Sequence, residues 1–122
     1  MQLHVSYSNP VPLYRQIVDQ IREKVLSGEL VPGASLPSIR QLAQEAGTSV
    51  ITTKRAYSEL EAEGLIVTKA GLGSFVADLD LEDLRTIRMR SIYERLSEIV
   101  ADARANGITS EELMRLFREA IE

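Results

Sequence analysis

The 122-residue sequence predicts an α+β fold, in which three short helices and a β-hairpin are followed by two further helices. Apolar residues recur at helical spacing in five segments, and glycine or proline separates most of them. Two short apolar runs on either side of AGLG predict the hairpin. This order divides the chain into a compact domain over residues 1–77 and a helical tail over residues 78–122.

The first helix is expected over residues 12–27, because Pro12 suits a first-turn position and Gly28 suits the residue after a helix. Seven apolar residues follow one face of it: Leu13, Tyr14, Ile17, Val18, Ile21, Val25 and Leu26. The next segment, LVPGASLP, reads as a loop.

The second and third helices are separated by only two residues, Gly47 and Thr48. The second helix begins at Ser38, which has Gln41 at capping-box spacing. The third helix opens at Ser49 and runs to about residue 63, although its first turns contain β-branched residues, which are mediocre helix formers. Its inward residues are expected to be Thr53, Ala56, Tyr57 and Leu60.

The hairpin consists of LIVTK, the turn AGLG and SFVA, and an acidic connector follows it. A long helix is expected over residues 81–105, where Asn106 and Gly107 end it. The last helix spans residues 109–121, and Thr109 with Glu112 forms its capping box.

Composition limits the possible functions. The chain has no cysteine, which excludes disulfides and thiolate chemistry and fits a reducing cytoplasm. No metal-ligand cluster, nucleophile motif or phosphate-binding loop is present, so we expect no enzyme activity, no metal and no cofactor. His4 is the only histidine, in an N-terminal segment expected to be mobile. No signal peptide or apolar run of membrane-spanning length is present, so no membrane partner is expected.

The net charge of −4 lies entirely in the tail. Residues 1–77 carry seven basic and seven acidic side chains, whereas residues 78–122 carry seven basic and eleven acidic ones. The first domain therefore has no net charge, and a locally basic face on it can bind nucleic acid.

Three helices followed by a hairpin are the order of a winged helix-turn-helix, whose third helix enters the DNA major groove. With its apolar residues inward, that helix directs Ile51, Arg55 and Ser58 outward, with Thr52 and Lys54 beside them. Hydroxyls and cations contact phosphates and base edges, and an aliphatic group packs on a thymine methyl. The alternative is a winged helix that binds proteins as a scaffold in a larger assembly.

Four segments resemble the DNA-binding domain of the GntR superfamily of bacterial regulators: PLYRQI, PGASLPSIRQLA, TTKRAYSELEAEGLI and GLGSFVA. The short tail and the wording RAYSELE resemble the YtrA subfamily. The resemblance implies a sequence-specific transcription regulator that binds a double-stranded operator. It also implies repression as the output. The operator sequence, the regulated genes and any small-molecule effector stay open.

The resemblance also implies which residues contact DNA. Ser38 and Arg40 match the start of the second helix, and two glycines match the tip of the wing. The full set is Ser38, Arg40, Ser49, Val50, Ile51, Thr52, Lys54, Arg55, Gly71 and Gly73. Two residues depart from the family pattern: Val50 replaces a frequent guanine-reading arginine, and Leu72 replaces a frequent wing lysine.

In the YtrA subfamily the tail is a dimerisation unit, which implies a homodimer on a pseudo-palindromic operator. The apolar stripe of the long helix is broader than a strict heptad, so a helical bundle between subunits is expected. The alternative is that both tail helices fold back on their own domain. The expected dimerisation residues are Leu84, Ile87, Ile92, Leu96, Ile99, Val100, Leu113 and Phe117.

Overall fold

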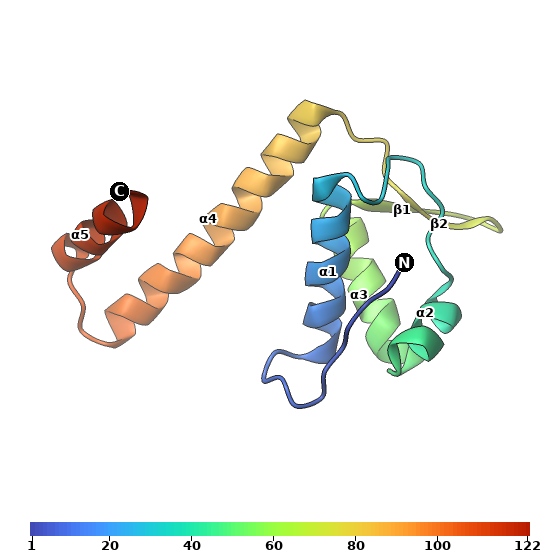
Figure 1. Cartoon of the computed structure of the whole chain (residues 1–122), viewed down its shortest axis with the longest axis horizontal. Coiled ribbons are helices and arrows are strands. Elements are labelled where there is room, and N and C mark those ends of the chain that lie inside the picture. The colour runs from blue at the N-terminus through green and yellow to red at the C-terminus, as the bar shows by residue number, and fades with distance from the viewer. The chain divides into compact units, whose positions relative to one another are not determined.

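The computed structural model describes residues 1–122 and contains five helices and one hairpin (Figure 1). The helices are α1 (Leu13–Ser27), α2 (Ile39–Ala46), α3 (Val50–Ala62), α4 (Leu81–Ala105) and α5 (Ser110–Ile121), and the strands are β1 (Ile66–Lys69) and β2 (Gly73–Val76). The predicted α+β order is confirmed, and the ends of the elements differ from the expected ones by one residue at most. The differences at the helix starts arise because Pro12, Ser38, Ser49 and Thr109 are cap residues.

The chain divides into two compact units, Met1–Leu84 and Arg85–Glu122. The division falls inside α4, whose first turn belongs to the first unit. In the first unit, α3 packs against both α1 and α2. The side chains of the three helices and the hairpin form one hydrophobic core. Its largest fully buried residues include Ile17, Val18, Ile21, Leu42, Leu60, Leu65, Ile66 and Val76.

Helices α1 and α3 run side by side in the same direction (Figure 1). Near their starts, the guanidinium carbon of Arg55 lies 3.8 Å from the centre of the Tyr14 ring. Two turns further along both helices, Arg22 donates to the carboxylate of Glu63. The earlier residue of α1 therefore contacts the earlier residue of α3, and the later one contacts the later one. The two helices are parallel, and their first turns lie at the same end.

The hairpin is antiparallel, with Ile66 opposite Val76 and Lys69 opposite Gly73. The segment before α2, predicted as a plain loop, pairs with the other edge of β2. Leu36 N donates to Ser74 O (2.9 Å), and Val76 N donates to Ala34 O (2.8 Å). This pairing satisfies backbone groups that an edge strand would otherwise leave open.

The N-terminal segment is held against α1, so the expectation of a mobile segment around His4 is wrong. The side chain of Gln20 accepts from His4 N (2.9 Å) and donates to His4 O (2.7 Å). One turn earlier, Gln16 accepts from Ser6 N (2.9 Å) and donates to Ser6 O (3.0 Å). Two glutamines four residues apart share one helix face, which allows both to bind the same extended segment. None of the helices has the length and apolar character needed to cross a membrane.

Candidate nucleic-acid interface

The start of α3 is closed by hydroxyl groups. The Ser49 Oγ accepts the Thr52 amide (3.1 Å) and donates to the Thr52 hydroxyl (2.9 Å). The buried Thr53 hydroxyl donates to Ser49 O (3.1 Å). Thr52 and Thr53 are β-branched and have a low helix propensity. Their hydrogen bonds with Ser49 offset this cost, because they complete the cap of the helix.

Replacing Ser49 with alanine is expected to lower the free energy of unfolding by about 1 kcal/mol, since the Thr52 amide loses its acceptor. Urea denaturation followed by circular dichroism measures the change. Ser58→Ala is the matched control, because Ser58 lies on the exposed middle of α3 and caps nothing. Equal stability of S49A and the wild type would contradict the capping role.

The exposed face of α3 has the composition expected from the sequence. The four predicted inward residues are all buried, whereas Val50, Ile51, Lys54, Arg55 and Ser58 are exposed. Ile51 stands out with 82% of its surface accessible. An aliphatic side chain this open contributes little to the core.

The start of α2 is tied to α3. Ser38 and Gln41 form the predicted capping box, with the Ser38 hydroxyl accepting the Gln41 amide (3.1 Å). The Tyr57 hydroxyl donates to Pro37 O (2.7 Å), and burial raises the pKa of this phenol, so it stays a donor at neutral pH. The bond holds the beginning of α2, with its exposed Arg40, against the middle of α3.

The cations of residues 1–77 fall into two groups. Five of the seven have partners within the chain: Arg15 with Tyr14, Arg22 with Asp19 and Glu63, Lys24 with Glu29, Arg55 with Tyr14 and Glu59, and Lys69 with Phe75. Arg40 and Lys54 have neither an ion pair nor an aromatic partner. Both belong to the helix-turn-helix, one on α2 and one on α3.

The tip of the wing is built from two glycines. Gly71 (φ 75°) and Gly73 (φ 110°) both lie in the region that side chains disfavour, and Leu72 N donates to Lys69 O (2.9 Å) to close the turn. Leu72 is 72% exposed at the tip, while the Lys69 ammonium lies 4.9 Å from the centre of the Phe75 ring. The wing therefore offers backbone and one apolar side chain at its end.

Arg55 does not project freely from α3 as expected. Its guanidinium covers the Tyr14 ring of α1, and its Nε lies 3.8 Å from a Glu59 oxygen. Tyr14, which the sequence assigned to the apolar face of α1, is the neighbour of Arg55 that sequence reasoning missed. No local signal indicates this contact, because Arg55 and Tyr14 lie far apart in the sequence and on different helices.

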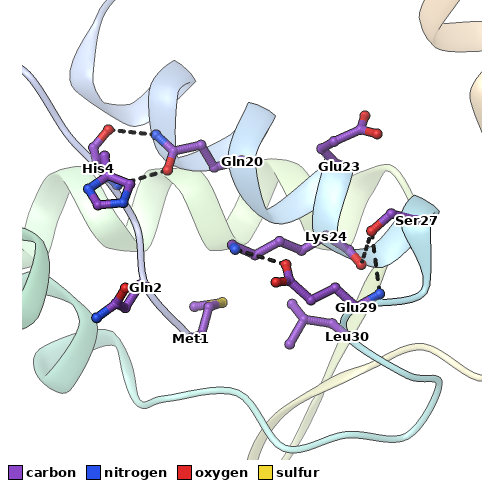
Figure 2. A pocket seen from close by; sticks show the side chains of 9 residues that line it. All are labelled: Met1, Gln2, His4, Gln20, Glu23, Lys24, Ser27, Glu29 and Leu30. Carbon is purple, nitrogen blue, oxygen red and sulfur yellow. Dashed lines mark hydrogen bonds and ion pairs between the residues drawn. The ribbon is translucent and has the colours of Figure 1, made fainter.

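Beneath the N-terminal segment lies an open cavity of about 690 Å³, shown in Figure 2. Two of its polar side chains have partners there: Lys24 Nζ is 2.9 Å from a Glu29 oxygen, and the Gln20 amide binds the backbone of His4. The cavity lies on α1 and includes none of the predicted DNA-contact residues.

In the second unit, α4 and α5 form an apolar groove of about 450 Å³. Five of the eight expected dimerisation residues line it: Leu96, Ile99, Val100, Leu113 and Phe117. Three of these are substantially exposed, with Ile99 at 52%, Phe117 at 45% and Leu96 at 38%. Ile92 is also exposed, and Leu84 and Ile87 are half-buried.

Three helices, a wing and unpaired cations on the helix-turn-helix define a winged-helix regulator. Residues 13–76 match the family described as bacterial regulatory proteins, gntR family. The chain belongs to this family.

Its relatives include the HTH-type transcriptional repressor YtrA of Bacillus subtilis, 33% identical over 96% of this chain and 90% of that protein. Among solved structures, YtrA from Sulfolobus acidocaldarius, described as a GntR-family transcription factor, is 30% identical with a TM-score of 0.59, covering 98% and 96% of the two chains. The DNA-binding domain of AraR in complex with operator ORX1 is 29% identical with a TM-score of 0.57, covering 63% of this chain and 99% of that one. The predicted resemblance to GntR and YtrA proteins is confirmed.

Proposed function

We propose that the chain is a transcription regulator that binds specific double-stranded DNA through α2, α3 and the wing. The observation that carries this proposal is the pair of unpartnered cations, Arg40 and Lys54, on the two helices of the helix-turn-helix. An exposed face with open cations and a prominent aliphatic side chain matches the phosphates and base edges of a major groove. The similar domain of AraR is bound to an operator in its solved structure, which supports the proposal.

The proposed contacts fall into three groups. Ser38 and Arg40 approach phosphates from the start of α2, and Lys54 does so from α3. The first turn of α3 faces the base edges, where Ser49 and Thr52 offer hydroxyls that are also part of the cap. Val50, Ile51 and Arg55 are further proposed contacts from the exposed face of α3. At the wing, the proposed contacts come from the backbone at Gly71 and Gly73.

The tail is proposed to join two copies of the chain. Residues 1–77 would form the DNA-binding domain and residues 78–122 the dimerisation tail, with the α4–α5 groove covered by the same surface of a partner. A two-fold dimer presents two recognition helices to the two halves of a pseudo-palindrome. The dimerisation residues are the eight predicted ones, of which five share the groove.

The proposed output is repression, in which the bound dimer occludes a promoter in the bacterial cytoplasm. YtrA of Bacillus subtilis is named a transcriptional repressor, which supports this assignment. The activity is binding without a chemical step. It needs no metal or cofactor, because phosphates and base edges are recognised by side chains alone.

Selection of binding sites from random DNA tests the proposal most directly. The full chain should enrich one sequence with two-fold symmetry, and its affinity should fall steeply with salt as counterions are released. Fluorescence anisotropy with the selected duplex measures this dependence. A chain that enriches no sequence, or that binds with an affinity independent of salt, would not be a specific DNA-binding regulator.

Replacing Ile51 with threonine is expected to change sequence preference rather than general affinity. The most exposed side chain of α3 would exchange part of its aliphatic surface for a hydroxyl that can donate to and accept from base edges, which shifts discrimination by about 1–3 kcal/mol at that base pair. Repeating the site selection with I51T and with the exposed Ser58→Ala control measures the effect. An I51T selection identical to that of the wild type would remove Ile51 from the base-reading surface.

A further inference from the structure

We propose that Arg15 and Arg55, ordered around the Tyr14 ring, form a further contact site for a DNA backbone phosphate beside α3, and that Glu59 competes with the phosphate for these arginines. Tyr14 is thus a positioning residue. This inference rests on the proposed DNA-binding function and extends the contact surface from the helix-turn-helix onto α1.

The Tyr14 side chain interacts with both cations. The central carbon of the Arg55 guanidinium lies 3.8 Å from the centre of the Tyr14 ring. A hydrogen bond to the Tyr14 side chain raises the pKa of Arg15. Holding two long, flexible side chains in place before binding lowers the entropy that binding must otherwise remove.

The N–H groups of the Arg55 guanidinium remain available for a ligand. Its side chain is 61% exposed, and its one ion pair, with Glu59, is long at 3.8 Å, so no short hydrogen bond occupies the guanidinium. A guanidinium presents a planar fork of donors that suits phosphate oxygens. The parallel packing of α1 and α3 places Arg15 and Arg55 at the end of the domain where α3 begins.

Glu59 is the acidic residue that would compete with a phosphate for Arg15 and Arg55. Arg15 interacts electrostatically with Asp19 and Glu59. Asp19 forms a 3.0 Å ion pair with Arg22, whereas the ion pair of Glu59 with Arg55 is long at 3.8 Å. A carboxylate in this position neutralises part of the charge that would attract a phosphate, so it weakens binding at the site.

A different role for the cluster is a bridge between α1 and α3. That bridge already exists two turns away, where Arg22 donates to both Asp19 and Glu63 and is largely covered. In contrast, the exposed cluster at Tyr14 would add little stability, because a surface ion pair contributes at most about 1 kcal/mol. The two roles predict different effects of removing Glu59. If the cluster is a bridge, the protein loses stability; if it is a phosphate site, the affinity for DNA rises.

The experiment measures binding of the full chain to a short fluorescein-labelled duplex of mixed sequence, by anisotropy between about 50 and 200 mM KCl. Five variants probe the cluster: R15Q, R55Q, R15Q/R55Q, Y14L and E59Q. Arg90→Gln on α4 is the matched control for loss of one positive charge. R40A/K54A reports separately on the proposed function, and thermal unfolding checks that each variant is folded.

The site predicts that R15Q/R55Q lowers the slope of log K against log salt by about 0.9 for each bound subunit, whereas R90Q leaves it unchanged. E59Q should bind about threefold more tightly or better at low salt, which a structural bridge would not produce. Y14L should weaken binding in the wild type but add nothing in the R15Q/R55Q background, because the ring acts through the two arginines.

The inference is overturned if R15Q/R55Q keeps the full salt slope while R40A/K54A loses affinity, since DNA binding would then bypass the cluster. An E59Q variant that binds no more tightly than the wild type also overturns it. If instead R40A/K54A binds as well as the wild type, the proposed function itself fails.

Discussion

Replacing Arg40 and Lys54 together with alanine is expected to lower affinity for the selected operator about 100-fold or more at moderate salt. Each cation lacks a partner within the chain, so each is available for a charge-assisted hydrogen bond with DNA. Such bonds contribute about 1.5–3 kcal/mol each when they are made. The loss should appear in gel shifts and in anisotropy titrations at fixed salt.

The same variant should also bind with a smaller salt dependence, because each phosphate contact contributes about 0.9 to the slope. K24A/R90A is the matched control, since it removes the same charges from α1 and α4 at positions outside the proposed interface. Stability should change little in either variant, because none of the four side chains is in the core. An R40A/K54A variant with wild-type operator affinity would refute DNA binding through the helix-turn-helix.

Replacing Leu96 with glutamate is expected to convert the proposed dimer to a monomer and to lower operator affinity about 100-fold or more. Leu96 lines the apolar groove between α4 and α5, and a carboxylate placed there would have to be desolvated in the interface without a partner. Loss of the second subunit removes the gain from linked half-sites, which is about 10²- to 10⁴-fold. Analytical ultracentrifugation should show twice the 13.6 kDa chain mass for the wild type and the single chain mass for L96E.

Ala101→Glu provides the control, because Ala101 is exposed on α4 and does not line the groove. It introduces the same charge into the same helix, so a dimer that survives A101E and not L96E identifies the groove as the interface. A wild-type chain that sediments as a monomer at micromolar concentration would instead mean that the groove is not covered by a second copy.

Local signals in the sequence were sufficient for the secondary structure. Capping residues such as Ser38, Ser49 and Thr109 mark helix starts, because their hydroxyls bind amides only a few residues away. The inward face of α3 followed from helical periodicity alone. The tail helices were found in the same way, because periodicity reports that a face is apolar, whatever covers it.

Side-chain partners far apart in the sequence were not predictable in the same way. Arg55 was assigned to the outward face from its helical angle, but its long side chain reaches sideways to Tyr14, which is 41 residues away in sequence. The N-terminal segment was expected to be mobile because it contains no helix or strand pattern. Its order comes from Gln16 and Gln20, whose amides bind the peptide groups of residues 6 and 4.

The sequence by itself determined the element order, the helix caps, the wing glycines and the family, because each depends on contacts within a few residues or on motifs read in order. The tertiary structure decided which cations stay open. Seven basic side chains look alike in residues 1–77, and only packing brings Glu63 to Arg22 and the Tyr14 ring to Arg55. Charge pairing across helices depends on their relative direction and register, so Arg40 and Lys54 emerge as the unpaired cations only once α1, α2 and α3 are packed.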